Sequence, residues 1–387
     1  MKKILILDAQ TIQTLPVAKS LKQRGYYVIL MCDTKNSYGY HTKYADRKII
    51  APSIRKDRNK FHNYLMDFIK SEKVDVLIPM FDDSAQYISF YQNEIRKYTK
   101  FITQDYDIFM MGYDKNKLMK ICQDNGFPHP LTIDLSSVEW DKAAVKMKYP
   151  ALIKPNISYG ARGLTIVNSM AEVKKSLPAV TENYGHCHLQ EYIAAGGHQY
   201  VVGLFVWSNA LINATVEKKI RYYPTKGGTG CFNQTVEKND LVKLCFNILK
   251  KINWEGFAHF DLIEDPNDGI IKIMELNPRI HSCIKSSFSA GVDFIENIVS
   301  SALGKQPKKY IYSPGSYLRY LGLDILWFIK ANNRFRAKPP WFKELFSSKH
   351  FLQDGSFDDP KPFIYGTLGG FLKQLHPRFR AAKKGMN

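Results

Sequence analysis

The 387-residue sequence has no long apolar run and no paired-cysteine motif. A membrane-spanning helix needs roughly 20 consecutive apolar residues, and the N-terminal stretch MKKILILDAQTIQ reaches Asp8 too early for a signal peptide. The six cysteines are scattered without a CxxC pair, which is typical of unlinked thiols in a reducing compartment. These absences predict a soluble, cytoplasmic protein with neither disulfide bonds nor structural zinc.

Acidic residues are scarce. The chain has 36 Asp and Glu but 55 Lys and Arg, so its net charge is +19. The imbalance is uneven: residues 301–387 hold 16 Lys and Arg but only 5 Asp and Glu. More than half of the positive excess therefore lies in the last quarter of the chain. Nucleic acid, an anionic membrane face or an acidic substrate would each complement this charge.

Short apolar runs alternate with a helical pattern in the first part of the chain. KKILILD and YYVILMCD read as buried strands, with a helix over residues 14–24 between them, and FHNYLMDFIKSEKVDVLIP adds a helix and a strand. This alternation predicts a small α/β domain, a doubly wound parallel sheet, over residues 1–112. The dinucleotide fingerprint GxGxxG is missing after the first strand, where DAQTIQ stands, so a dinucleotide site is not expected there.

The pattern changes at Tyr113. DKNKLMKICQDNGFPHP predicts a helix capped by Asp114 and ended by Gly126 and the prolines that follow. YPALIKP and TIVNS read as strands on either side of the glycine-rich turn SYGARGL, and antiparallel strands and helices continue to about residue 312. We therefore expect an α+β domain to begin at residue 113.

Two glycine-containing segments are candidate nucleotide-binding elements. In LIKPNISYGARGL, the strand residue Lys154 precedes a loop with Gly160 and Gly163, and glycines let backbone N–H groups approach phosphate oxygens closely. In LQEYIAAGGHQYVVGLF, a strand reaches Glu191 and Ile193 before a glycine pair, and such a hinge offers backbone groups to an adenine edge. Taken alone, each segment also fits an ordinary hairpin.

The segment FAHFDLIEDPNDGIIKIMELNPRIH carries the strongest signal. Two predicted strands are joined by the turn DPNDG, with Asp261 on the first strand and Glu275 on the second. Because residues two apart on a strand share a face, Asn277 and Arg279 point the same way as Glu275. Two carboxylates and an amide oxygen suit Mg²⁺, and an adjacent arginine suits a phosphoryl group or an oxyanion. A solvated strand face is the alternative.

These segments, with the helix that begins at residue 114, come in the order and approximate spacing of the ATP-grasp ligases. The chain resembles the carboxylate–amine ligase branch related to carbamoyl phosphate synthetase and D-alanine ligase, over about residues 1–312. The resemblance implies a two-subdomain ATP-grasp fold after the N-terminal domain. It divides the chain into a small subdomain over residues 113–188, a large subdomain with the metal site over residues 189–312, and a basic, aromatic-rich extension over residues 313–387. It also implies an ATP-dependent ligase that joins a carboxylate to an amine, or to a thiol, through an acyl phosphate.

The resemblance also assigns roles to particular residues, with ATP and Mg²⁺, or Mn²⁺ in its place, as cofactors. The implied nucleotide-binding residues are Lys117, Lys154, Ser158, Gly160, Gly163, Glu191, Ile193 and Gln199. The implied metal ligands are Asp261, Glu275 and Asn277, and the implied catalytic residues are Arg279, Lys219 and Arg221.

Two residues depart from the family pattern. Gln199 stands where many members place a glutamate for the ribose hydroxyls, and Asp261 stands where glutamate is common. Gln199 puts the nucleotide preference in doubt, and the shorter side chain of Asp261 reaches less far toward the metal. His259 and His281 are expected to be structural or rim residues, because acyl phosphate chemistry needs no imidazole.

The segment NATVEKKIRYYPTKGGTG resembles the family's substrate loop. Lys219 and Arg221 alternate on one strand face and are the candidates for meeting the carboxylate, whereas Lys218 faces away. A solvated basic edge strand is the alternative. The pair at residues 82–83 follows a predicted parallel strand and is a candidate for receiving the amine, or else an acidic loop without a ligand.

The extension mixes large apolar residues with basic ones, in YLRYLGLDILWFIKANNRFRAKPPWFKELF and again in FIYGTLGGFLKQLHPRFRAAKK. This composition is typical of helices on an anionic membrane surface, and it predicts a peripheral location at the inner face of the membrane. Packing against the ligase body is the alternative. Nucleic acid is not an expected partner, because no recognised binding module is present, and a homodimer is left open.

Two other functions compete with the ligase. One is a phosphotransferase that uses the same cleft without an amine, and the other is a catalytically silent ATP-binding module. The intact set of Asp261, Glu275, Asn277 and Arg279 argues against the silent module.

Overall fold

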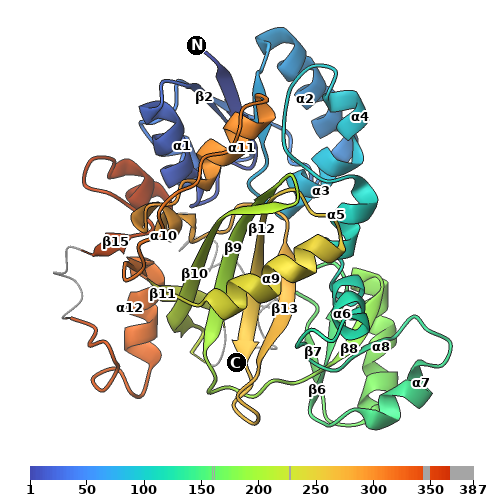
Figure 1. The fold of residues 1–387 in the computed structure, drawn as a ribbon. Coiled ribbons are helices and arrows are strands. Elements are labelled where there is room, and N and C mark those ends of the chain that lie inside the picture. Colours follow the sequence, from blue (N-terminus) through green and yellow to red (C-terminus); the bar gives the residue numbers. More distant parts are fainter. Residues whose placement is uncertain (159, 161, 226–227, 343–348, 367–387) are drawn as a thin grey trace.

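The computed structural model describes residues 1–158, 160, 162–225, 228–342 and 349–366. Three β-sheets form its framework, and helices cover them (Figure 1). No helix within these ranges is long and apolar enough to cross a membrane. All six cysteines are buried and free.

The N-terminal sheet has four parallel strands in the order β3-β2-β1-β4. Its strands are β1 (Lys3–Ile6), β2 (Tyr27–Cys32), β3 (Arg47–Ile50) and β4 (Val76–Ile78). Its helices are α1 (Thr14–Gln23), α2 (Arg58–Glu72), α3 (Asp82–Phe90), α4 (Gln92–Ile95) and α5 (Tyr106–Tyr113). Successive β1 side chains point to opposite faces, so Ile4 and Ile6 pack on the α1 side, whereas Leu5 and Leu7 pack on the α2 side. The predicted N-terminal parallel sheet is confirmed.

A small antiparallel sheet follows, in the order β5-β8-β6-β7. It consists of β5 (Thr132–Asp134), β6 (Ala151–Pro155), β7 (Thr165–Val167) and β8 (Cys187–Glu191). Its neighbours in the chain are α6 (Lys115–Asp124), α7 (Trp140–Ala143) and α8 (Met170–Tyr184). The N-cap of α6 is Asp114, as predicted, because its carboxylate accepts hydrogen bonds from the N–H groups of Asn116 and Lys117.

The large sheet has seven strands in the order β13-β12-β9-β10-β11-β14-β15. They are β9 (Gln199–Trp207), β10 (Ala210–Tyr223), β11 (Thr229–Thr235), β12 (Gly256–Glu264), β13 (Ile271–Asn277), β14 (Tyr317–Arg319) and β15 (His350–Leu352). The accompanying helices are α9 (Asn239–Lys251), α10 (Ile284–Ser289), α11 (Phe294–Ala302) and α12 (Leu321–Lys330). One face of the sheet packs on the apolar side of α9, where Val202 and Leu204 meet Leu241 and Ile248. The other face carries the polar side chains that alternate with them, and also Phe205 and Phe257, which pack with Phe294 of α11.

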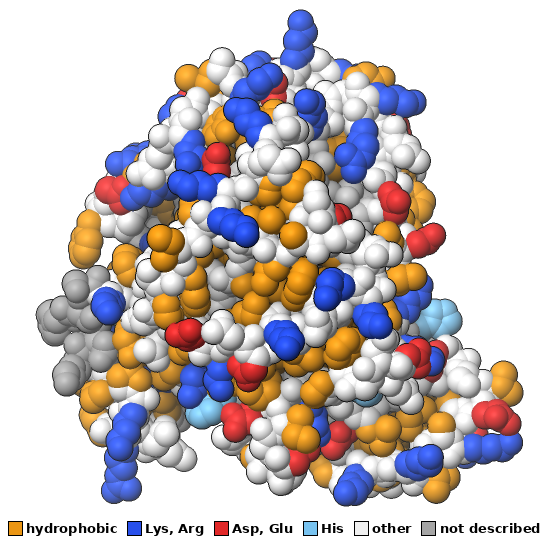
Figure 2. Space-filling model, in the orientation of Figure 1, with side chains coloured by type: hydrophobic (Ala, Val, Ile, Leu, Met, Phe, Trp, Pro, Cys, Tyr) orange, Lys and Arg blue, Asp and Glu red, His pale blue; other side chains and the backbone are white. Residues whose placement is uncertain are grey.

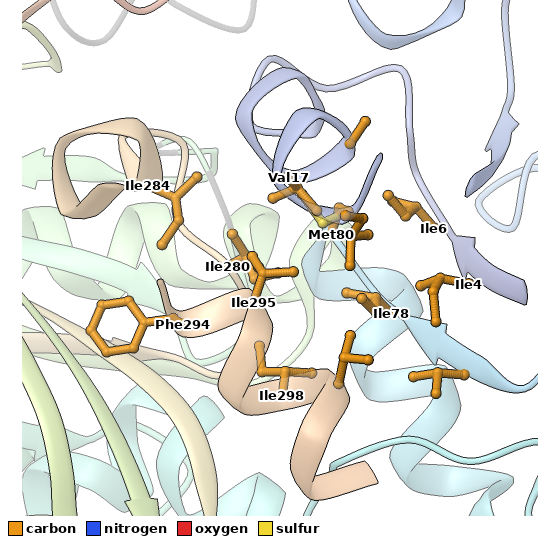
Figure 3. Close-up of a cluster of buried hydrophobic side chains, with 14 of the residues drawn as sticks. Ile4, Ile6, Val17, Ile78, Met80, Ile280, Ile284, Phe294, Ile295 and Ile298 are labelled. Carbon is orange, nitrogen blue, oxygen red and sulfur yellow. The ribbon is translucent and has the colours of Figure 1, made fainter. Parts of the chain in front are cut away.

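The N-terminal sheet and the large sheet share one apolar core (Figure 3). Ile295 and Ile298 on α11 pack with β1 residues such as Ile4. Ile280 belongs to the same cluster and directly follows Arg279 in the chain. This core therefore fixes the end of β13 against the N-terminal sheet.

The described part of the extension packs against the body, which was the alternative to helices on a membrane surface. β14 pairs with β11, and β15 pairs with β14, so both extend the large sheet. Asp359 accepts hydrogen bonds from Thr42 and from the N–H of Lys43 in the N-terminal part. The predicted extension also includes residues 343–348 and 367–387, which lie outside the described residues.

Candidate active site

Three predicted metal ligands converge at the paired strands β12 and β13. Asp261 lies directly opposite Glu275 in the strand register, and Asn277 follows two residues later on the same face. The Asn277 amide nitrogen is 3.3 Å from Asp261 Oδ2 and 3.2 Å from Glu275 Oε1. These side chains project from the face of the sheet opposite α9, so the helix does not cover them.

This donor set fits a hard divalent cation. Carboxylate and amide oxygens are the ligands that Mg²⁺ prefers, and the two carboxylates flank the Asn277 amide. A half-turn of that amide would present its oxygen, rather than its nitrogen, to the space between the carboxylates.

Basic side chains surround the carboxylates. Lys219 Nζ is 3.0 Å from Asp261 Oδ1, and Lys115 Nζ is 3.5 Å from Glu275 Oε2. Burial alone would lower the pKa of Lys219, but the Asp261 carboxylate beside it raises that pKa above its ordinary value. The centre therefore holds two carboxylates and two cations in close contact, an arrangement suited to anionic phosphates with a bound cation.

Arg279 joins this centre to the N-terminal sheet. Its guanidinium donates to Asn277 Oδ1 at 3.2 Å and to Asp82 Oδ1 at 3.1 Å. Asp82 is the first residue of α3 and is almost fully buried, and Asp83 pairs with Arg55. The acidic pair is therefore neither an open loop nor a free amine site, because Asp82 holds Arg279 in place.

A different lysine from the predicted Lys117 lies beside the carboxylates. The structure brings Lys115, not Lys117, to Glu275, and Lys115 Nζ also donates to the Ser158 carbonyl at 2.7 Å. Lys117 is exposed on α6. The signal that would have found Lys115 is the N-cap at Asp114, because it makes residue 115 the first residue of the helix.

Lys154 lies on β6 and donates to Gln190 Oε1 at 2.6 Å. The pKa of Lys154 is lowered to about 8, chiefly by burial; Glu275 opposes this shift and Lys115 adds to it. Lys154 is thus a partly desolvated amine at the same centre. An anion that binds beside it would stabilise its charged form.

The glycine-rich loop between β6 and β7 is described at Ser158, Gly160 and Gly163. Gly160 and Gly163 have positive φ angles of 63° and 74°. A Cβ at Gly163 would come within 2.7 Å of the Pro155 ring and 2.8 Å of the Tyr184 ring. Glycine is therefore required at position 163 by both conformation and space.

The predicted adenine hinge lies where β8 ends. Glu191 Oε2 accepts from the N–H of Leu131 at 3.1 Å and lies 3.5 Å from Lys272 Nζ. Ile193, two residues after the end of β8, is half-buried. Gln199 begins β9, and its Oε1 is 3.5 Å from Lys219 Nζ.

Arg221 does not share the face of Lys219, which corrects the predicted alternation. A β-bulge separates the two, because Lys219 pairs with Asn233 while Arg221 pairs with Phe232. Arg221 is buried on the other face, where it forms a two-pronged ion pair with Asp324 at 2.8 and 3.1 Å. We therefore remove Arg221 from the candidate catalytic residues and assign it to anchoring α12.

A second buried cluster lies beside the centre. Ligand atoms of Glu217, His281 and Cys283 all lie within 4.8 Å of one another. Burial raises the pKa of Glu217 to about 7 and lowers that of His281 well below its ordinary value. Lys219 lies two residues after Glu217, and Arg279 lies two residues before His281. Because these cations would repel a metal ion, we assign the cluster no metal. Burial also lowers the pKa of His259 to about 3, so neither imidazole is charged at neutral pH.

Comparison with known proteins identifies the fold. Residues 113–283 match the model of an ATP-grasp domain. The N-terminal section of the carbamoyl phosphate synthase large chain of Aquifex aeolicus is 25% identical over 170 residues, which cover 42% of this chain and 29% of that protein. The D-aspartate ligase of Enterococcus faecium is 24% identical over 235 residues, 54% of each chain.

A solved biotin carboxylase from Campylobacter jejuni has a TM-score of 0.69 at 18% identity, over 82% of this chain and 74% of that one. Residues 113–283 thus form an ATP-grasp domain, and the chain shares the fold of the solved biotin carboxylase. It spans less than a third of the length of the carbamoyl phosphate synthase section that it matches.

Proposed function

We propose that the protein is an ATP-dependent ligase that activates a carboxylate as an acyl phosphate and joins it to an amine. The observation that carries this proposal is the convergence of Asp261, Glu275 and Asn277 with Lys115, Lys219 and Arg279. Such a centre neutralises phosphate charge and orients a reacting anion, which is the main requirement of phosphoryl transfer.

The nucleotide would lie between the small sheet and the large sheet, with residues 113–188 and 189–312 as the two subdomains. Lys115 and Lys154 would hold its phosphates, and the hinge after Glu191 would receive the adenine. Asp261, Glu275 and Asn277 would hold Mg²⁺, which would supply positive charge against the phosphates.

The reaction would take place in two steps. A carboxylate oxygen held by Lys219 and Arg279 would form a bond to the γ-phosphorus, and the bond from that phosphorus to the β-phosphate oxygen would break, releasing ADP. An amine nitrogen would then form a bond to the acyl carbon, inorganic phosphate would leave, and the amine would lose a proton. Arg279 suits the first step because its guanidinium donates to the buried Asp82 carboxylate and is therefore preorganised.

A cavity of about 380 Å³ beside this centre fits the amine. It opens at the carboxyl ends of β1 and β2 and includes Asp8, Asp33 and Phe81. The Arg279 guanidinium lies 5.6 Å from the Phe81 ring centroid, so the ring adjoins both the cavity and the reacting centre. Burial raises the pKa of Asp8 to about 6, and its carboxylate is therefore charged at pH 7 and above. Arg55 also lines the cavity but pairs with Asp83, so the carboxylates of Asp8 and Asp33 favour an amine over the phosphotransferase alternative.

Product analysis tests the proposal. The purified protein is incubated with ATP, Mg²⁺, a panel of carboxylates including D-aspartate, and hydroxylamine as a general amine. A ligase releases ADP only when a carboxylate is present and forms an acyl hydroxamate. A stable phosphorylated product without hydroxamate would support the phosphotransferase instead, and the absence of both from a panel that the protein binds would support the silent module.

A further inference from the structure

Among the described residues, none covers one apolar face of helix α12. Its inner side is fixed by Asp324, which is fully buried between Arg221 and Arg319, and by buried Trp327. Ile325 and Ile329 lie one turn apart on the outer side, where their exposed fractions are 42% and 58%. The helix is therefore anchored along one side and presents isoleucines along the other.

Aromatic side chains continue this exposed surface. Phe328 contacts Phe335, Trp341 and Phe342, with ring centroids 5.5, 5.0 and 5.6 Å away. Phe335 and Phe342 nevertheless have exposed fractions of 76% and 57%. Large apolar side chains gathered in one place and open to solvent usually mark a binding surface.

The charged residues within this segment are all basic. Residues 325–342 contain Lys330, Arg334, Arg336 and Lys338 and no Asp or Glu. Arg334 donates to the carbonyl of Ile329 at 3.1 Å, which holds a cation beside the exposed isoleucine. Figure 2 shows hydrophobic and basic side chains side by side at the lower left, where Figure 1 places α12.

We propose that this basic apolar surface docks the protein on an anionic lipid bilayer. It is formed by Ile325, Ile329, Lys330, Arg334, Phe335, Arg336, Lys338 and Phe342. Exposed aromatic and aliphatic side chains enter the interface between headgroups and acyl chains, while basic side chains meet the anionic headgroups.

The charge pattern selects this partner over two others. A symmetric contact with a second copy would bring the same four cations together without a counter-charge. Nucleic acid would complement the cations but would leave the exposed isoleucines and phenylalanines without an apolar partner. The proposal is independent of the ligase activity.

The test uses the full-length chain, because truncation at residue 312 would remove two strands of the large sheet and the partner of Arg221. Co-sedimentation is measured with vesicles of 70% phosphatidylcholine and 30% phosphatidylglycerol and with pure phosphatidylcholine vesicles. We expect binding to the anionic vesicles at 50 mM NaCl and much weaker binding at 500 mM NaCl, because salt screens the attraction.

Two variants and a matched control locate the surface. Each basic residue near an anionic surface contributes about fivefold to binding, so replacing Lys330, Arg334, Arg336 and Lys338 with Gln should weaken binding on the order of a hundredfold or more. The control replaces Lys142, Lys146, Lys148 and Lys174 with Gln, which changes the net charge equally at exposed positions near the small sheet. It should bind nearly as the wild type does.

The double variant Phe335→Ser and Phe342→Ser should weaken vesicle binding about tenfold or more, because it removes apolar contact without changing charge. An unchanged melting temperature shows that each variant folds. The proposal is overturned if the wild type does not bind anionic vesicles at 50 mM NaCl, if the control weakens as much as the surface variant, or if the double variant binds normally. A change of oligomeric state in the double variant would instead assign the surface to self-association, and RNA binding without vesicle binding would assign it to nucleic acid.

Discussion

Lys154 should couple ATP binding to proton uptake. Its amine bonds a neutral amide oxygen, that of Gln190, and burial lowers its pKa to about 8. About half of the Lys154 amines are therefore uncharged at pH 8. Phosphate oxygens placed beside this amine favour the charged form and raise its pKa, so binding draws a proton from solvent.

The size of the effect follows from the pKa. If bound ATP raises the Lys154 pKa well above 9, binding at pH 8 takes up about half a proton. The same linkage lowers ATP affinity about tenfold between pH 7 and pH 9, as the free protein loses the proton that binding requires. The lysine is charged, and the affinity highest, on the acidic side of pH 8.

Calorimetry measures the uptake directly, because the binding enthalpy at pH 8 then varies with the ionisation enthalpy of the buffer. Lys154→Arg, which keeps its charge across this range, should lose the buffer dependence. Lys175→Ala, at an exposed position on α8, should keep it. Equal proton uptake by the wild type and Lys154→Arg would refute the assignment of Lys154 to the phosphates.

Other predictions concern separate parts of the chain. Lys115→Ala should weaken ATP binding about tenfold or more, because it removes a charged phosphate contact, whereas Lys117→Ala should leave ATP binding unchanged. Equal effects of the two variants in an ATP titration would reject Lys115 as the phosphate contact. Asp324→Asn should lower the free energy of unfolding by about 3 kcal/mol, because it leaves Arg221 buried without its carboxylate, and a denaturant midpoint equal to the wild type would count against it. Burial raises the pKa of Glu217 from 4.5 to about 7, so the folded state binds its proton more tightly and this residue costs stability as pH rises through that range. Relative to Glu217→Gln, the wild type should lose about 3 kcal/mol between pH 4.5 and pH 8, measured by urea unfolding at both pH values, and a constant difference would contradict the burial.

The sequence predicted those parts of the structure that follow from strong local patterns. The parallel N-terminal sheet follows from buried apolar runs that alternate with helices, and the pairing of Asp261 with Glu275 follows from two strands joined by a short turn. Alternation along β13 then places Asn277 beside both carboxylates.

The missed features depend on details that such patterns do not carry. A single inserted residue in β10 turns Arg221 to the opposite face from Lys219, and no residue type marks that bulge. The choice of Lys115 over Lys117 is an exception, because the predicted cap at Asp114 already makes residue 115 the first residue of the helix. β14 and β15 are three-residue strands, too short for a periodic signal, and they form only by pairing with the completed sheet.

The carboxylate pair is the centre of the proposed chemistry, and Glu275→Gln tests it most directly. The variant keeps the shape of the side chain but removes the charge that would hold Mg²⁺ against the phosphates. Carboxylate-dependent ADP release is measured for the wild type, for Glu275→Gln and for Glu237→Gln, a control at an exposed position just beyond β11. We predict that Glu275→Gln lowers kcat on the order of a hundredfold or more with an unchanged melting temperature, while Glu237→Gln retains full activity. Wild-type turnover by folded Glu275→Gln would contradict the assignment of this centre to catalysis.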